Sequence, residues 1–131
     1  MAASGSIVVG YVPKPEGRAA LQRAVEEARL REAPLVVVTS RRSAKEGTPE
    51  AEEEIGEVRA LLLETGVDFD LRPLVSVFDP AEDLIRTATE VDAQLLVIGL
   101  RRRSPVGKLV LGSNAQRILL DSPCSVLAVK P

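Results

Sequence analysis

The feature that most constrains the fold is a regular alternation of short apolar runs with longer amphipathic stretches. Four of the five runs are nearly continuous and rich in β-branched residues, as expected of strands covered on both faces in a parallel sheet. Pro73 interrupts the third run, which predicts an edge strand because proline cannot donate to a sheet hydrogen bond. The predicted strands are Ser6–Val12, Leu35–Ser40, Asp70–Val77, Gln94–Gly99 and Ser125–Lys130.

The stretches between these runs have four helical patterns. Two of them place apolar residues three and four positions apart, as amphipathic helices do. These apolar positions are Leu21, Ala24, Val25 and Ala28 in Glu16–Arg31, and Ile55, Val58, Leu61 and Leu62 in Pro49–Thr65. The other two patterns begin with capping boxes, with Asp79 and Ser113 as the N-cap residues. The first helix is predicted to run to about Val91, and the second through Leu120 until Pro123 stops it.

The strand–helix alternation predicts an α/β fold. A chain of 131 residues suits one domain, residues 1–131. Crossover helices between successive strands give a doubly wound, five-stranded, mostly parallel sheet with four helices. Both a flavodoxin-like and a Rossmann-like strand order fit this pattern. In either, ligands bind beyond the carboxyl ends of the strands, where the strand order reverses, so the loops after the first, second and fourth strands form the candidate site.

Composition narrows the range of functions. The net charge of −2 gives no argument for nucleic acid or membrane partners, and the apolar runs are too short to cross a bilayer. The single cysteine, Cys124, excludes an intramolecular disulfide and fits a reducing cytoplasm, where we expect the protein to reside. The residues Met1–Ser6 do not resemble a signal peptide. Because the chain has no histidine, neither a histidine general base nor a zinc site is expected.

The loop after the fourth strand carries the most information about function. It holds Arg101, Arg102, Arg103 and Lys108 and ends at Gly112-Ser113, where a helix begins. Helix N-termini present free N–H groups and partial positive charge, so they attract phosphate. The residues alone leave open the alternative that Ser113 is only a cap and that the arginines only solvate a loop. Neither a Walker loop nor a dinucleotide fingerprint matches the chain.

The segment Leu95–Lys130 resembles the ATP-binding members of the universal stress protein family. Gly99, Gly112 and Ser113 fall at the spacing of that family's nucleotide motif, and weaker likeness at Ile7–Gly10, Arg18–Leu21 and Asp79–Ala81 extends the resemblance along the chain. The resemblance implies an adenine-nucleotide alpha-hydrolase-like fold. It also implies a small regulatory stress-response protein with a pocket for ATP, AMP or another adenine nucleotide, and magnesium only together with the nucleotide.

The same resemblance assigns the pocket residues. The purine is expected near Val12, Ser40 and Ile98, and the phosphates near Gly99, Arg102, Gly112, Ser113 and Asn114.

Two of these positions depart from the family pattern. Val12 replaces the aspartate that holds the ribose hydroxyls, and an unpaired hydroxyl there costs about 1–3 kcal/mol. Arg102 replaces the second motif glycine but can pair a phosphate itself. Lys14 adds a further cation near the edge of the expected pocket. The pocket is thus predicted to be degenerate, with recognition shifted from the sugar to the phosphates.

Three classes of function follow. The first is a sensor of an adenine nucleotide or another small phosphorylated ligand. The second is a non-nucleotide-binding interaction scaffold of the same fold, a homodimer through Ser125–Lys130, the strand through which members of the family commonly dimerise. The third is a slow ATPase, against which stand the absence of histidine and of an obvious carboxylate in the candidate site. Nucleic-acid binding through Arg101–Arg103 is disfavoured, because the chain is acidic and aromatic residues make up only 2% of it.

Overall fold

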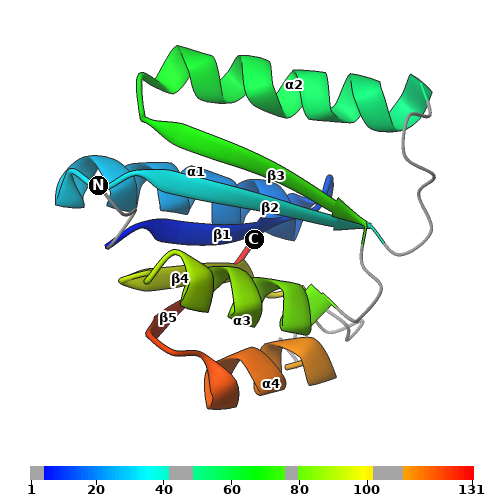
Figure 1. The fold of residues 1–131 in the computed structure, drawn as a ribbon. Helices are drawn as coiled ribbons and strands as arrows, with labels where there is room; N and C mark the ends of the chain where they lie inside the picture. The colour runs from blue at the N-terminus through cyan, green and yellow to red at the C-terminus, as the bar shows by residue number, and fades with distance from the viewer. Residues whose placement is uncertain (1–4, 42–48, 76–79, 102–110) are drawn as a thin grey trace.

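The fold of the protein was obtained as a computed structural model that describes residues 5–41, 49–75, 80–101 and 111–131. Strands and helices alternate along the chain, as the sequence predicts (Figure 1). The strands are β1 (Ile7–Tyr11), β2 (Leu35–Arg41), β3 (Phe69–Val75), β4 (Leu95–Gly99) and β5 (Ser125–Val129). The helices are α1 (Pro15–Arg31), α2 (Pro49–Thr65), α3 (Pro80–Glu90) and α4 (Ser113–Asp121).

The sheet has the strand order β3-β2-β1-β4-β5, and all four neighbouring pairs are parallel. This is the Rossmann order, so the flavodoxin-like alternative is excluded. The prediction that Pro73 marks an edge strand is confirmed, since β3 lies at one edge of the sheet. The connection from β3 through α3 returns past β1 to β4, which places the reversal of strand order between β1 and β4.

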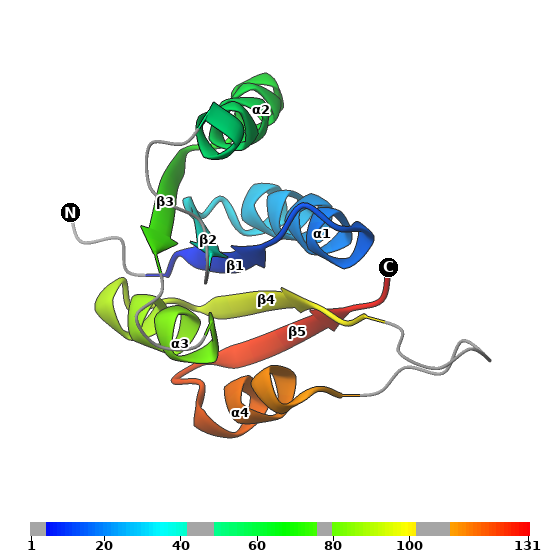
Figure 2. The same cartoon turned by 90° about the vertical axis from the view of Figure 1, so that its right-hand side faces the viewer.

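Two apolar layers cover the sheet, one on each face. Helices α1 and α2 pack on one face, and α3 and α4 pack on the other (Figure 2). The predicted apolar face of α1 is buried throughout. In α2 the prediction is right for Val58 and Leu62 but wrong for Leu61, whose side chain is 53% exposed. Val58 and Leu62 lie four positions apart on the buried face of α2. Leu61, one position before Leu62, is therefore turned away from that face toward solvent.

Strand β5 differs from the other near-continuous strands because it forms the second edge of the sheet. Val126 and Ala128 pack against one apolar layer, and Leu127 and Val129 against the other, so both faces contact the core as predicted. All four side chains nevertheless remain partly exposed. In the described part of the chain, no helix combines the length and the apolar character that crossing a bilayer requires.

The start of α4 corrects one prediction. Gly112, not Ser113, is the N-cap residue, with extended backbone angles, and Ser113 is the first helical residue. The helix thus begins one position earlier than the predicted capping box requires, and Gln116 is not the third helical residue. Its Nε2 instead donates to the carbonyl oxygen of Leu111 at 2.9 Å. The predicted N-cap Asp79 lies outside the described residues.

Candidate functional site

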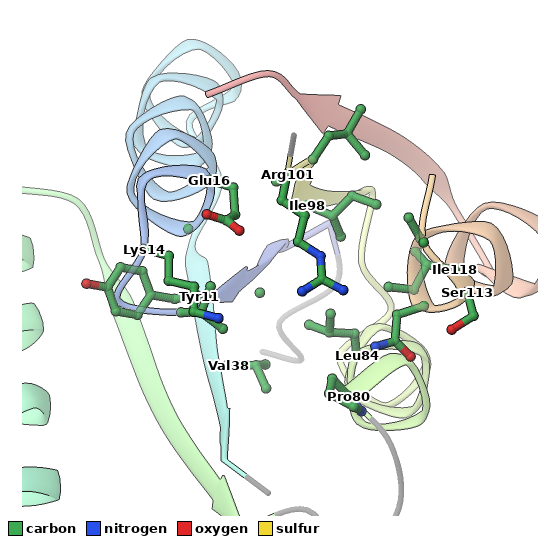
Figure 3. Close-up of a pocket in the computed structure, with 18 residues that line it drawn as sticks. Tyr11, Lys14, Glu16, Val38, Pro80, Leu84, Ile98, Arg101, Ser113 and Ile118 are labelled. Carbon is green, nitrogen blue, oxygen red and sulfur yellow. The ribbon is translucent and has the colours of Figure 1, made fainter. Parts of the chain in front are cut away.

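A pocket of about 250 Å³ lies at the carboxyl ends of β1 and β4, where the strand order reverses (Figure 3). This is the position at which doubly wound sheets bind their ligands. One part of its lining is apolar and comes from β2, β4, α3 and α4. Its apolar wall consists of Val38, Pro80, Leu84, Ile98 and Ile118. Such a wall suits a flat apolar group, because burying that group removes apolar surface from water on both sides.

Three helices begin at the edge of the pocket, which is lined by Glu16 of α1, Pro80 of α3 and Ser113 of α4. The first turn of α1 carries the acid Glu16, and the first turn of α3 carries Glu82 and Asp83. The first turn of α4 carries no acidic residue. Of the three helices, only α4 has a first turn without an acidic side chain to offset the positive end of its dipole. This helix end therefore favours an anion in the pocket.

The backbone at the start of α4 is suited to bind such an anion. Gly112, Ser113 and Asn114 line the pocket, and the N-cap residue Gly112 has no side chain with which to cap this helix end. The first N–H groups of a helix have no partner within the helix, so these amides are available as donors. Ser113 does not occupy the cap position, so a role as the helix cap does not account for it.

Three charged residues form what we call the charged rim: Lys14, Glu16 and Arg101. Figure 3 shows Glu16 and Lys14 entering from the start of α1 and Arg101 from the end of β4, with their side chains directed toward the same hollow. Within the described ranges, none of the three forms an ion pair. The rim therefore offers two cations and one carboxylate to a ligand.

Three glycines of the pocket lining allow strands and helices to pack closely together. We call them the glycine floor: Gly10, Gly17 and Gly99. A Cβ on Gly17 would overlap the carbonyl oxygen of Val12 and lie 2.7 Å from its nitrogen. A Cβ on Gly99 would overlap the carbonyl oxygen of Glu16 and lie 2.6 Å from its carbonyl carbon. A Cβ on Gly10 would lie 2.8 Å from Cδ1 of Leu84. The first turn of α1 is thus packed directly against the ends of β1 and β4.

Six of the eight residues predicted from the sequence come together in the lining of this pocket. They are Val12, Ile98, Gly99, Gly112, Ser113 and Asn114. Arg102 and the side chain of Ser40 lie outside the described residues, although the backbone of Ser40 belongs to β2. Tyr11 lines the pocket and also packs against the α1 layer.

The site contains one carboxylate that the sequence does not predict there. Glu16 lies in the pocket, so the expectation that the site lacks an obvious carboxylate is wrong. In the sequence Glu16 resembles any first-turn acid, and only the packing of Gly17 and Gly99 brings it over the ends of β1 and β4. Where the structure describes the chain, no group of three or more histidine, cysteine, aspartate or glutamate residues is placed to hold a metal ion.

Comparison with known proteins agrees with the family resemblance seen in the sequence. A sequence profile described as the universal stress protein family matches residues 4–130. A universal stress protein of Mycolicibacterium smegmatis is 46% identical over 133 residues, which cover 95% of this chain and 97% of that protein.

Two solved structures extend the likeness to the fold. A universal stress protein from Archaeoglobus fulgidus superposes with a TM-score of 0.79 at 34% identity, covering 96% of this chain and 98% of that one. Another from the same organism, in complex with dAMP, superposes with a TM-score of 0.75 at 28% identity, covering 99% and 100% of the two chains.

Proposed function

This chain belongs to the universal stress protein family, and from that premise we propose that its pocket binds an adenine nucleotide, or another small phosphorylated ligand, as a regulatory signal. The observation that carries the proposal is the N-terminus of α4, whose first turn holds no acidic residue and whose first residues line the pocket. A relative of the same fold has been solved in complex with dAMP, which supports an adenine nucleotide over other phosphorylated ligands.

In this proposal the ligand lies across the pocket with its two ends in different surroundings. The purine packs near Val12, Ser40 and Ile98, against the apolar wall. The phosphates lie near Gly99 and Arg102 and at the amides of Gly112, Ser113 and Asn114. Lys14 and Arg101 add positive charge beside them. Magnesium, where it is present, enters with the nucleotide, bound through phosphate oxygens and water.

Calorimetric titration of the full-length protein with AMP, ADP, ATP and cyclic AMP tests the proposal. We expect saturable binding of at least one of them, together with a rise in melting temperature that grows with ligand concentration. Repeating each titration with magnesium and with a chelator separates the nucleotide from its ion. If none of the four nucleotides gives heat or shifts the melting temperature in either condition, the proposal is wrong.

A second candidate function, an interaction scaffold, is favoured by the exposed edge of β5. Val126, Leu127, Ala128 and Val129 are partly exposed on this edge strand, and such edges are usually covered or paired. We propose that two copies of the chain associate through β5 in the cytoplasm. Dimerisation through β5 is compatible with ligand binding, since no residue of β5 is among the described residues that line the pocket.

The mass of the protein in solution tests the dimer. The carbonyl of Val129 accepts a hydrogen bond from the Leu100 amide, so it faces β4, and the amide of the neighbouring Ala128 points to the free edge. Ala128→Pro should therefore remove an intermolecular hydrogen bond while leaving the bonds to β4 in place. We expect a dimer for the natural chain and a monomer for this variant at micromolar concentration. A monomeric natural chain would overturn the proposal.

A further inference from the structure

Glu16 occupies a defined place between the two halves of the pocket. The first turn of α1 packs against the end of β1, where Gly17 meets the backbone of Val12, and against the end of β4, where Gly99 meets the backbone of Glu16. In the proposed function these two strand ends lie at the base end and the phosphate end of the ligand. The backbone of Glu16 itself lies at Gly99, and Figure 3 shows its side chain in the pocket between Lys14 and Arg101. In the proposed function the sugar of the nucleotide lies between these two ends.

The chemistry of Glu16 suits that place. Its side chain is half-buried, it enters the pocket beside Lys14 and Arg101, and among the described residues it has no ion-pair partner (Figure 3). An ionised carboxylate only accepts hydrogen bonds, and its two oxygens can accept from two neighbouring hydroxyl groups. Val12, at the end of β1, has no acceptor in its side chain. Glu16 is thus the one acidic side chain among the described lining residues.

We infer that Glu16 determines the sugar specificity of the pocket, with its carboxylate accepting hydrogen bonds from the vicinal 2′- and 3′-hydroxyls of a ribonucleotide. The inference rests on the proposed function and adds to it a ligand class, ribonucleotides in preference to 2′-deoxyribonucleotides. Hydrogen bonds to a charged acceptor are about twice as strong as neutral ones, so the loss of one hydroxyl has a measurable effect on affinity.

A purely structural role for Glu16 makes a different prediction. An acid in the first turn stabilises its helix through the helix dipole, and removing it lowers stability slightly without regard to the ligand's sugar. Removing a negative charge near the phosphates also strengthens the binding of every nucleotide alike. Both effects cancel in the ratio of two affinities measured on the same variant, so that ratio isolates the contact with the sugar.

The experiment measures the affinities of AMP and 2′-deoxy-AMP by calorimetry for the natural chain, Glu16→Ala, Glu16→Gln and Glu26→Gln. Glu26 lies on α1 but outside the pocket lining, in an exposed ion pair with Arg23, so its variant removes one acidic charge from the same helix. For the natural chain and Glu26→Gln we expect AMP to bind about tenfold more tightly than the deoxy form. The ratio should fall to about one in Glu16→Ala and take an intermediate value in Glu16→Gln, whose amide oxygen is a weaker acceptor.

The outcomes separate this inference from the function on which it rests. If both nucleotides bind the natural chain equally, or if Glu16→Ala keeps the tenfold ratio, Glu16 does not select the sugar, while nucleotide binding itself stands. If neither nucleotide, nor ADP, ATP or cyclic AMP, binds the natural chain, the proposed function fails and the inference fails with it. Melting curves of the four proteins show whether each variant is folded.

Discussion

At the glycine floor of the pocket, three residues without side chains are packed against backbone or against a buried leucine, whereas at the charged rim three long side chains extend into open space. The floor consists of Gly10, Gly17 and Gly99, and the rim of Lys14, Glu16 and Arg101. The two regions meet at the start of α1, which carries Glu16 of the rim and Gly17 of the floor. Substitutions in the floor should therefore act on stability and substitutions in the rim on binding, although both regions belong to one site.

This difference changes how the motif glycine Gly99 is understood. The family resemblance places Gly99 near the phosphates. In the structure a Cβ at Gly99 would collide with the backbone of Glu16, so the absence of a side chain is already required for α1 to lie where it does. This glycine of the nucleotide motif is therefore required by packing alone, and its presence does not by itself establish nucleotide binding.

The largest expected effect comes from adding a methyl group to the floor. Gly17→Ala and Gly99→Ala each place a Cβ against backbone, which cannot move aside as a side chain can. We expect each to lower the free energy of unfolding by about 2–3 kcal/mol, which chemical denaturation measures. The matched control is Gly56→Ala in α2, where a Cβ would meet nothing within 4 Å; it should raise stability by about 0.5–1 kcal/mol. Unchanged stability in both floor variants would contradict the close packing described here.

A rim substitution should show the opposite behaviour. Arg101 is exposed and lies in the pocket lining, so Arg101→Ala should change the free energy of unfolding by less than about 0.5 kcal/mol. Loss of one charge-assisted contact should weaken the binding of a phosphorylated nucleotide about tenfold in calorimetry. Arg59→Ala, at an exposed position of α2 outside the pocket lining, is the control and should bind as the natural chain does. Equal affinities for the two variants would remove Arg101 from the site.

The smallest effect is expected at Gly10, which sharpens the comparison because it belongs to the floor but faces a side chain. Its Cβ would meet the end of the Leu84 side chain, which can shift by a few tenths of an ångström. We expect Gly10→Ala to cost less than about 1 kcal/mol in unfolding free energy. Because Leu84 also lines the pocket, ligand affinity should change by about threefold at most. A loss of stability as large as that of Gly17→Ala would show that Leu84 cannot yield.

Much of the fold follows from the sequence because the apolar runs are long enough to specify strands and the helical patterns have clear ends. The run at Leu35 and the face around Leu21 are examples in which local pattern and tertiary burial agree. Leu61 shows the limit, since the i, i+3 spacing gives an apolar stripe but not the rotation of the helix about its axis. The strand order also needed the structure, because both doubly wound orders share one local pattern.

The site was predictable where a motif lies in one segment and not where it depends on packing. Gly112, Ser113 and Asn114 are adjacent in the chain, where the start of a helix and the resemblance to a family motif indicate them. Glu16 and Leu84 reach the pocket only because α1 and α3 pack across the ends of the strands. The cap at Ser113 was misplaced by one residue, because a glycine before a serine can hold the extended conformation that a cap requires.

The central position of β1 also bears on how the protein is made. Its residues bond β2 on one side and β4 on the other, with Ile7 aligned to both Leu35 and Leu95. During translation β1 leaves the ribosome long before β4, so one edge of the future middle strand stays open while most of the nascent chain is still being synthesised. Loops closed late are slow to form, and unpaired edges invite pairing with other chains. The arrival of β4 beside β1 is therefore the step that closes the open edge of the middle strand.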